Sequence, residues 1–140
     1  MDLNNHIKHI IDNIYISDFN IKHYETKLND LNFKYIININ KVINCNSCTT
    51  LNLNIDDLTK INFNETNDFI IYKLQKELDK DKKTNILICA DNLDIPLIIM
   101  GIFLIQIINI SFTETIYWLS RKTNSLTLST NVNKLLFNQI

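Results

Sequence analysis

The chain has 140 residues and a mass of 16.5 kDa, and its 14 basic and 15 acidic side chains give a formal net charge of −1 at pH 7. This balance argues against a basic nucleic-acid-binding surface and against a polybasic patch for anionic membranes. The 46% of hydrophobic and 21% of charged residues are typical of a folded protein. The length predicts a single domain, which we place over residues 1–140.

Glycine is unusually scarce in this sequence. The chain holds one glycine, one proline and one alanine, whereas asparagine and isoleucine together supply about a third of it. A protein of this length holds roughly ten glycines on average. Gly101 alone cannot build a glycine-rich dinucleotide fingerprint or a Walker phosphate loop, so both kinds of nucleotide site are excluded. Asparagine, isoleucine and lysine have AT-rich codons, and this bias suggests a large DNA virus or another AT-rich genome as the source.

The sequence shows no signal for secretion or membrane insertion. No basic segment followed by an apolar stretch opens the chain. The longest apolar run, at 97–108, would span roughly 18 Å as a helix, which is shorter than the ~30 Å core of a bilayer. Three cysteines, an odd number, suggest a reducing compartment. We therefore expect a cytoplasmic protein, located in the host cell if its gene is viral.

Four segments have the residue pattern of β-strands. They are rich in β-branched and aromatic residues, and they span 13–17, 35–39, 51–55 and 85–89. The third alternates strictly and predicts one polar face, whereas the second and fourth are apolar enough to be buried. The polar segment at 40–49 predicts a loop.

The segments between and after these strands have the residue periodicity of helices. Asp18 can cap a first helix that presents Ile21, Tyr24 and Leu28 on one face. Further helices are expected at 64–80, from Asp94 through the apolar run, at 111–121 and from 131 onward, with Asp94 as an N-cap. The alternation predicts an α/β domain with a mostly parallel central sheet of about four to five strands flanked by helices.

The junction between the fourth strand and the apolar helix carries the most suggestive chemistry. It reads ICADNLDIP, from Ile88 to Pro96. A cysteine at the carboxyl end of a strand, followed by a loop that opens into a helix, is where α/β proteins often hold reactive groups. The N–H groups of such a loop bind anions and stabilise a thiolate. The segment resembles the active-site loop of the cysteine-dependent dual-specificity protein phosphatases, whose signature is H-C-x-x-G-x-x-R-[ST].

The resemblance extends in order over nearly the whole chain. IIDNIYISD (10–18) is similar to the family's opening strand, LNDLNFKYIININ (28–40) to its second strand, and LNLNIDD (51–57) to the strand before its general acid. SFTETIYWLSRK (111–122) is similar to a late helix of the family, and STNVNKLLFNQI (129–140) to its closing helix. The resemblance implies the dual-specificity phosphatase fold for the single domain. It also places Cys89 at the nucleophile and Asp57 at the general acid that protonates the leaving oxygen.

The loop departs from the family pattern at most of its other positions. The family's histidine, glycine, arginine and hydroxyl residue correspond to Ile88, Asn92, Ile95 and Pro96. The remaining loop positions are Ala90, Asp91, Leu93 and Asp94. Asparagine tolerates left-handed backbone angles better than most residues, so Asn92 could keep the turn that glycine makes in the family.

These departures remove the electrostatics that phosphoryl transfer needs. An arginine guanidinium forks onto two phosphate oxygens, and loss of a comparable donor costs on the order of 10²–10³ in rate. Asp91 and Asp94 would repel a phosphate dianion, by ~1 kcal/mol per charge pair at ~4 Å in water and ~4 kcal/mol near a protein surface. The same carboxylates would raise the pKa of the Cys89 thiol. The sequence therefore predicts a pseudophosphatase, a catalytically inactive homologue that binds proteins or modulates signalling.

Two other functions stay open at this level. The chain could be a thiol-dependent enzyme with weak or altered phosphatase activity that uses Cys89 and Asp57. It could also be a structural subunit, for instance a homodimer. Cys89 could instead pack in the core, as free cysteines often do, and Asp57 could be a loop acid or a helix cap. We expect no cofactor, metal, nucleic acid or membrane, and a protein partner whose identity the sequence does not give.

Two further groups of residues have alternative interpretations. Cys45 and Cys48 form a C-x-x-C segment, which could be a redox pair, half of a zinc site or part of a polar loop. A zinc site would need further ligands, and the available histidines are His6, His9 and His23. Tyr117, Trp118 and Leu119 in the helix at 111–121 predict core packing with one exposed ring, and an exposed aromatic ring could face a partner.

Overall fold

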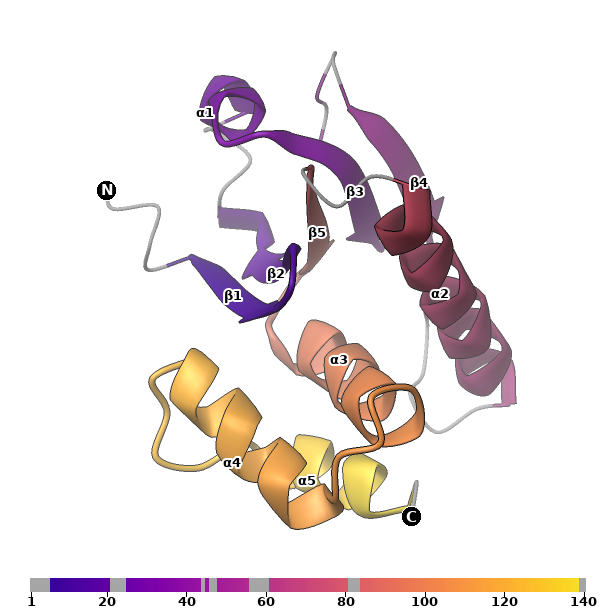
Figure 1. The fold of residues 1–140 in the computed structure, drawn as a ribbon, viewed down its shortest axis with the longest axis vertical. Coiled ribbons are helices and arrows are strands. Elements are labelled where there is room, and N and C mark those ends of the chain that lie inside the picture. The colour runs from indigo at the N-terminus through magenta and orange to yellow at the C-terminus, as the bar shows by residue number, and fades with distance from the viewer. Residues whose placement is uncertain are drawn as a thin grey trace.

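A computed structural model describes residues 6–20, 25–43, 45, 48–55, 61–80 and 84–138 of the chain (Figure 1). Its elements, in chain order, are β1 (Ile7–Ile11), β2 (Ile14–Asp18), α1 (Glu25–Asp30), β3 (Phe33–Ile39), β4 (Thr49–Leu53), α2 (Ile61–Lys80), β5 (Asn85–Ala90), α3 (Asp94–Gln106), α4 (Phe112–Lys122) and α5 (Thr130–Phe137). Within these residues, no helix combines the length and the apolar content needed to cross a bilayer.

The strands form one five-stranded sheet in the order β1-β2-β5-β3-β4. The pairs β2–β5, β5–β3 and β3–β4 are parallel, and β1 is antiparallel to β2. The predicted α/β class with a mostly parallel sheet is therefore confirmed. Because β5 is central and parallel to both neighbours, the carboxyl ends of β2, β3 and β5 lie at one edge of the sheet.

Strand β1 was not predicted from the sequence pattern. Its sequence, IKHII, places a lysine and a histidine in succession and lacks clear alternation. What holds it is the hairpin with β2, in which Ile11 pairs with Ile14 across a two-residue turn and Asp12 has a φ of 50°. The long-range support comes from Trp118 of α4, whose indole N–H donates to the carbonyl oxygen of Ile10 at 2.9 Å. β4 also begins two residues earlier than predicted, because Thr49 already pairs with Tyr35.

Alternate residues of β5 face two different cores. Ile86, Ile88 and Ala90 belong to the larger core, which also receives buried side chains from α2, α3, α4 and α5. Leu87 and Cys89 face the smaller core, formed by Phe19, Leu28, Phe33, Ile36, Ile43, Leu87 and Cys89. Leu28 comes from α1, so α1 covers one face of the sheet and the other helices cover the opposite face (Figure 1). The apolar helix α3 is buried along most of its length, which explains its lack of a polar side.

Asparagine takes the backbone positions that glycine often fills. The described residues with positive φ are Asp12, Asn32, Asn40, Asn109 and Asn124. Asn32, Asn109 and Asn124 follow the ends of α1, α3 and α4, where a left-handed residue ends a helix. Gly101 serves a different purpose, because a Cβ atom there would lie 2.5 Å from the Cδ atoms of Leu136 on α5. The single glycine therefore allows close packing of two helices and makes no turn.

Most of the predicted helices are present, but several begin at a different residue than the sequence predicts. The serines before α4 and α5 are N-caps, since Ser111 accepts a hydrogen bond from the N–H of Glu114 and Ser129 accepts one from Val132, both at 3.2 Å. α5 thus begins at 130, one residue before the prediction, and α2 begins at 61 instead of 64.

The first predicted helix is described only in part. Asp18 caps the turn that follows β2, because its Oδ1 accepts from the N–H of Asn20 at 3.0 Å. Leu28 of α1 is buried as predicted. Ile21 and Tyr24 lie outside the described residues.

Candidate functional site

Cys89 lies at the carboxyl end of β5, paired in register with Ser17 of β2 and Asn38 of β3. Its side chain is completely buried in the smaller core. The thiol donates a hydrogen bond to the main-chain carbonyl oxygen of Asp18, with 3.3 Å between Sγ and O. Cys89 is thus a buried core residue, as the packing alternative predicts.

The surroundings of Cys89 keep its thiol protonated. Burial raises the pKa of this thiol far above its ordinary value of 9.0, and the nearby carboxylate of Asp18 raises it further. A main-chain hydrogen bond from Ala90 acts in the opposite direction, and Asp91 adds a smaller upward effect. Since the thiolate is the reactive form of cysteine, this environment opposes nucleophilic chemistry at neutral pH.

The loop after Cys89 is shorter than expected. Ala90 still belongs to β5, so the loop comprises only residues 91–93. Asp94 was predicted as an N-cap, but Leu93 occupies that position without a side-chain hydrogen bond, and Asp94 is the first residue of α3. The side chain of Asn92 accepts from the N–H of Asp94 at 2.9 Å, which satisfies one of the free helix N–H groups. Asn92 does not have the positive φ that we considered for it.

Both loop carboxylates have partners from distant segments. Asp91 forms an ion pair with Lys41 from the loop after β3, with 3.0 Å between Nζ and Oδ1. Asp94 accepts a hydrogen bond from the hydroxyl of Ser129, the N-cap of α5, at 3.2 Å. No local sequence signal connects Lys41 or Ser129 to this loop, and sequence reasoning missed both. Lys41 compensates part of the negative charge that the two aspartates bring.

Ile95, at the position of the family's arginine, is partly buried and packs against the larger core. Pro96 next to it is buried in the same helix. The chain's single arginine, Arg121, lies on α4, with its guanidinium 5.5 Å from the ring centroid of Tyr117. The loop therefore presents an apolar side chain where phosphate recognition needs a fork of N–H donors.

The predicted general acid, Asp57, lies outside the described residues. The described chain leading to it ends at Ile55, two residues earlier. Asn40 holds Ile55 by two hydrogen bonds, accepting from its N–H at 2.7 Å and donating to its carbonyl oxygen at 3.1 Å. Since Asn40 follows β3, this anchor lies at the same edge of the sheet as the end of β5.

The C-x-x-C segment differs from the expectation of reduced cysteines. Cys45 and Cys48 are joined by a disulfide, and Cys89 is a free thiol.

The histidines that could complete a zinc site have other partners or are not described. His9 contacts the carbonyl oxygen of Asp12 and His6 contacts Asp18, whereas His23 lies outside the described residues. Within the described ranges, no three histidine, cysteine or acidic side chains lie together in the way a metal ion requires.

The outer surface of α4 carries a hollow of about 390 Å³, lined by Glu114, Tyr117, Trp118, Arg121 and Lys122. Tyr117 is 64% exposed, whereas Leu119 on the inner face is buried, so the prediction of core packing with one exposed ring is confirmed. Each basic residue lies near an aromatic ring one helical turn earlier. Nζ of Lys122 lies 5.6 Å from the centroid of the Trp118 ring, and the guanidinium of Arg121 lies 5.5 Å from the centroid of the Tyr117 ring.

Solved structures of known proteins share this fold. No family model matches the sequence, and no curated protein matches it. A leucine rich repeat and phosphatase domain containing protein from Entamoeba histolytica superposes with a TM-score of 0.77 at 16% identity, over 98% of this chain and 92% of that one. Human DUSP28 gives a TM-score of 0.77 at 8% identity, over 95% and 91% of the two chains.

A third similar structure is the human tyrosine phosphatase-like serine/threonine/tyrosine-interacting protein. It superposes with a TM-score of 0.68 at 13% identity, over 96% of this chain and 95% of that one. At these identities the likeness concerns the fold, which extends over nearly the full length of both chains. The chain has the fold of the dual-specificity protein phosphatases.

Proposed function

We propose that this chain is a catalytically inactive protein with the dual-specificity phosphatase fold, which binds a protein partner. The observation that carries the proposal is the state of Cys89, whose thiol is buried, hydrogen-bonded to Asp18 and held in its protonated form. A phosphatase of this type attacks phosphorus with an exposed thiolate, and the surroundings of Cys89 disfavour that form.

The charges near Cys89 support the same proposal. Phosphoryl transfer depends on positive groups that stabilise the equatorial oxygens in the transition state. At this loop Asp91, Asp94 and Asp18 bring three carboxylates, and Lys41 is already paired with Asp91. Ile95 packs against the core and offers no hydrogen-bond donor from its side chain. A phosphate dianion would therefore meet a negative rim.

A thiol-dependent enzyme that uses Cys89 and Asp57 is the less favoured alternative. Such an enzyme also requires an accessible thiolate, even for an uncharged substrate. Cys89 has no exposed surface, and the acceptor of its hydrogen bond is a carbonyl oxygen, which stabilises the thiol over the thiolate.

The hollow on α4 is the face through which we propose that a partner binds. Tyrosine, tryptophan and arginine are enriched among the residues that dominate binding energy at interfaces, and all three line this hollow. Two cations and one carboxylate give it a net positive charge, in contrast to the loop after Cys89. By charge complementarity we assign its occupant as an acidic segment of a partner protein that also carries apolar side chains to lie on the rings.

A peptide-binding experiment tests this assignment. The probes are a fluorescent peptide that alternates glutamate with leucine and a matched peptide with lysine in place of glutamate, measured by anisotropy. We expect the acidic peptide to bind with an affinity that falls as salt rises, and the basic peptide not to bind. Arg121→Glu with Lys122→Glu should abolish binding.

The control variant is Lys73→Glu with Lys76→Glu on α2, which makes the same charge change and also removes a lysine that lies 5.4 Å from an aromatic centroid, that of Phe69. It should bind like the wild type. Equal binding of both peptides, or equal loss in both double variants, would contradict an acidic partner segment on α4.

A further inference from the structure

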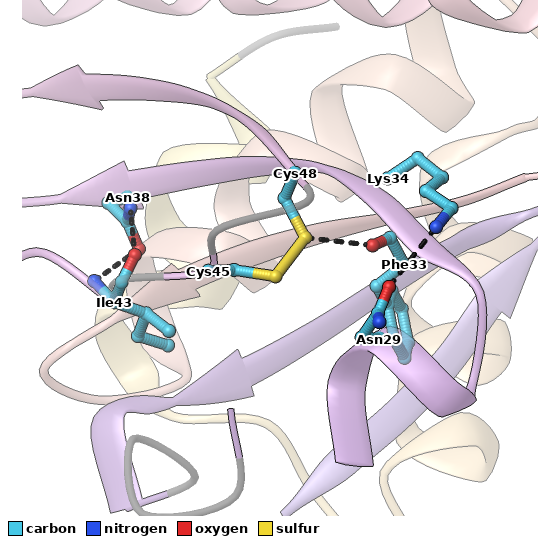
Figure 2. The surroundings of a disulfide bond; sticks show 7 residues. All are labelled: Asn29, Phe33, Lys34, Asn38, Ile43, Cys45 and Cys48. Atoms are coloured by element: carbon cyan, nitrogen blue, oxygen red, sulfur yellow. Dashed lines mark hydrogen bonds between the residues drawn. A yellow bond between two sulfur atoms is a disulfide. The ribbon is translucent and has the colours of Figure 1, made fainter. Parts of the chain in front are cut away.

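The segment between β3 and β4 contains the disulfide between Cys45 and Cys48 (Figure 2). Both side chains are partly buried and pack against the smaller core. The binding face proposed above lies on α4 and does not use these sulfur atoms. Their arrangement points to a chemistry of its own.

The backbone holds the two cysteines together independently of the sulfur–sulfur bond. The N–H of Cys48 donates to the carbonyl oxygen of Cys45 at 3.2 Å, which links the main chains of the two cysteines directly. The Cα atoms are 5.4 Å apart, within the usual range for a disulfide. After reduction this main-chain hydrogen bond would keep the two thiols adjacent, so the disulfide could form again without a rearrangement of the fold.

The structure also offers an acceptor for a reduced thiol. Sγ of Cys48 lies 2.9 Å from the main-chain carbonyl oxygen of Phe33 (Figure 2). A sulfur in a disulfide has no hydrogen to donate, whereas the thiol of reduced Cys48 can donate to this oxygen. Cys48 directly precedes Thr49, where β4 begins to pair with β3, so the reduced form would keep a link at this point. Both redox states therefore fit the same backbone.

A cross-link of this kind contributes little to stability. Only two residues separate the cysteines, and the entropy that a disulfide removes from the unfolded chain grows with the length of the closed loop. A disulfide between distant strands would restrict the unfolded chain far more. The short spacing therefore favours a chemical role for the bond over a structural one.

The third cysteine is separated from this pair. Cys48 lies beside Phe33 at the beginning of β3, whereas Cys89 pairs with Asn38, five residues further along the same strand. At ~3.3 Å per residue the two positions are about 16 Å apart along the strand. Exchange within one molecule is therefore confined to Cys45 and Cys48.

We propose that Cys45 and Cys48 form a reversible dithiol–disulfide site whose substrates are thiols, such as glutathione, which act as the reductant, and whose oxidant in the reverse direction is the corresponding disulfide, such as oxidised glutathione. A substrate thiolate attacks one Sγ, forms a mixed disulfide and releases the other cysteine as a thiolate, which takes a proton from water. A second substrate thiolate attacks the substrate sulfur of the mixed disulfide and releases the remaining cysteine. The site gains two electrons and two protons, and the two substrate thiols leave joined as a disulfide.

Thiol counting on the folded full-length protein tests the proposal. The protein is equilibrated in buffers of reduced and oxidised glutathione, quenched with a maleimide and weighed by mass spectrometry. We expect two labels per chain in reducing buffer, none in oxidising buffer, and the same curve when it is approached from either direction. Cys89→Ala should follow the wild-type curve, whereas Cys45→Ala should lose the two-label transition and form a mixed disulfide with glutathione.

Two results would overturn the proposal. One is a disulfide that glutathione or dithiothreitol reduces only after the chain is unfolded, as followed by circular dichroism. The other is a pair of thiols that oxidised glutathione does not oxidise to a disulfide, or oxidises only to a disulfide between two molecules. If Cys45→Ala fails to fold, Cys48→Ser provides the same comparison, because a serine hydroxyl can still donate to the oxygen of Phe33.

Discussion

The thiol of Cys89 donates a hydrogen bond to the carbonyl oxygen of Asp18, with 3.3 Å between Sγ and O. The bond joins the carboxyl ends of β5 and β2, where Asp18 and Ala90 are paired in register. It holds the thiol hydrogen beside an acceptor and the sulfur among apolar side chains of the smaller core. The residue at the expected nucleophile position thus stabilises the packing of the two strands.

The first prediction concerns the reactivity of this thiol. In the folded, oxidised protein Cys89 should resist iodoacetamide at pH 7–8, because the side chain is buried and its pKa is raised by burial and by Asp18. Denaturation should expose one reactive thiol per chain. Mass spectrometry of the alkylated protein measures both values, and rapid alkylation of the folded chain at Cys89 would contradict the buried position.

The same environment predicts how stability depends on alkaline pH. The pKa of Cys89 is raised in the folded state, so the unfolded chain loses its thiol proton first as pH rises above 9.0. Stability from this group is complete below that value and declines above it. Burial and Glu77 raise the pKa of Tyr35 from 10.0, which adds a decline that begins about one pH unit higher.

Urea unfolding between pH 7 and 11 measures this dependence. Cys89→Ala should remove the part of the decline that begins near the ordinary cysteine pKa, and Tyr35→Phe should remove the later part. A wild type and a Cys89→Ala variant with parallel pH profiles over this range would show that the folded thiol titrates normally.

Gly101 gives a prediction about packing. Gly101→Ala should destabilise the protein by about 1–3 kcal/mol through overpacking, because its Cβ would meet Leu136 of α5 at 2.5 Å. The better helix propensity of alanine offsets up to about 1 kcal/mol of this cost. The Leu136→Ala variant lacks the Cδ atoms that the new Cβ of residue 101 would meet. Gly101→Ala should therefore be neutral or stabilising in that background. Urea unfolding of the four proteins measures the coupling, and additive effects would contradict direct contact.

The contact between Cys48 and Phe33 predicts a difference between two variants. Cys48→Ser should be more stable than Cys48→Ala by about 0.5–1.5 kcal/mol, since the serine hydroxyl can donate to the carbonyl oxygen of Phe33. Both variants lack the disulfide, so its loss cancels in the comparison. Equal unfolding midpoints would remove the support for a hydrogen bond in the reduced state.

Much of the fold follows from periodicity in the sequence. The segments that form β2, β3 and β5 are rich in isoleucine. Their near-continuous runs of β-branched residues are typical of strands that are buried on both faces. The predicted helix from 111 is present with Ser111 as its N-cap, whereas the N-cap of α5, Ser129, was not predicted. β1 escaped prediction because its stability comes from long-range contacts, the pairing with β2 and the bond from Trp118 to Ile10.

The candidate site was less accessible to sequence reasoning. The sequence identified Cys89 and its loop, but the burial of Cys89 depends on residues from β2, α1 and β3, which come together only in the fold. Lys41 and Ser129 reach Asp91 and Asp94 from segments 50 and 35 residues away in the chain. For Cys45 and Cys48, the spacing alone left a redox pair, a zinc site and a loop open, and the disulfide between them is the observation that supports our proposal of the first.

Reconstruction of the loop tests whether the scaffold alone retains the capacity to bind phosphate. The variant combines Ile95→Arg and Asn92→Gly with Asp91→Asn and Asp94→Asn, which restores the fork of donors and removes two carboxylates. We expect it to bind tungstate, a phosphate analogue, measurably by calorimetry, whereas the wild type should not. The control keeps Ile95 and carries the other three changes, and equal binding by both would exclude a role for the arginine position.

The most direct test of whether this chain lacks phosphatase activity is hydrolysis of an aryl phosphate by the purified wild-type chain and by Cys89→Ser. Both proteins should release phenolate at the rate of buffer alone, because the thiol is buried and protonated and the loop lacks an arginine. Turnover by the wild type above the buffer rate that disappears in Cys89→Ser would contradict the assignment of an inactive phosphatase fold.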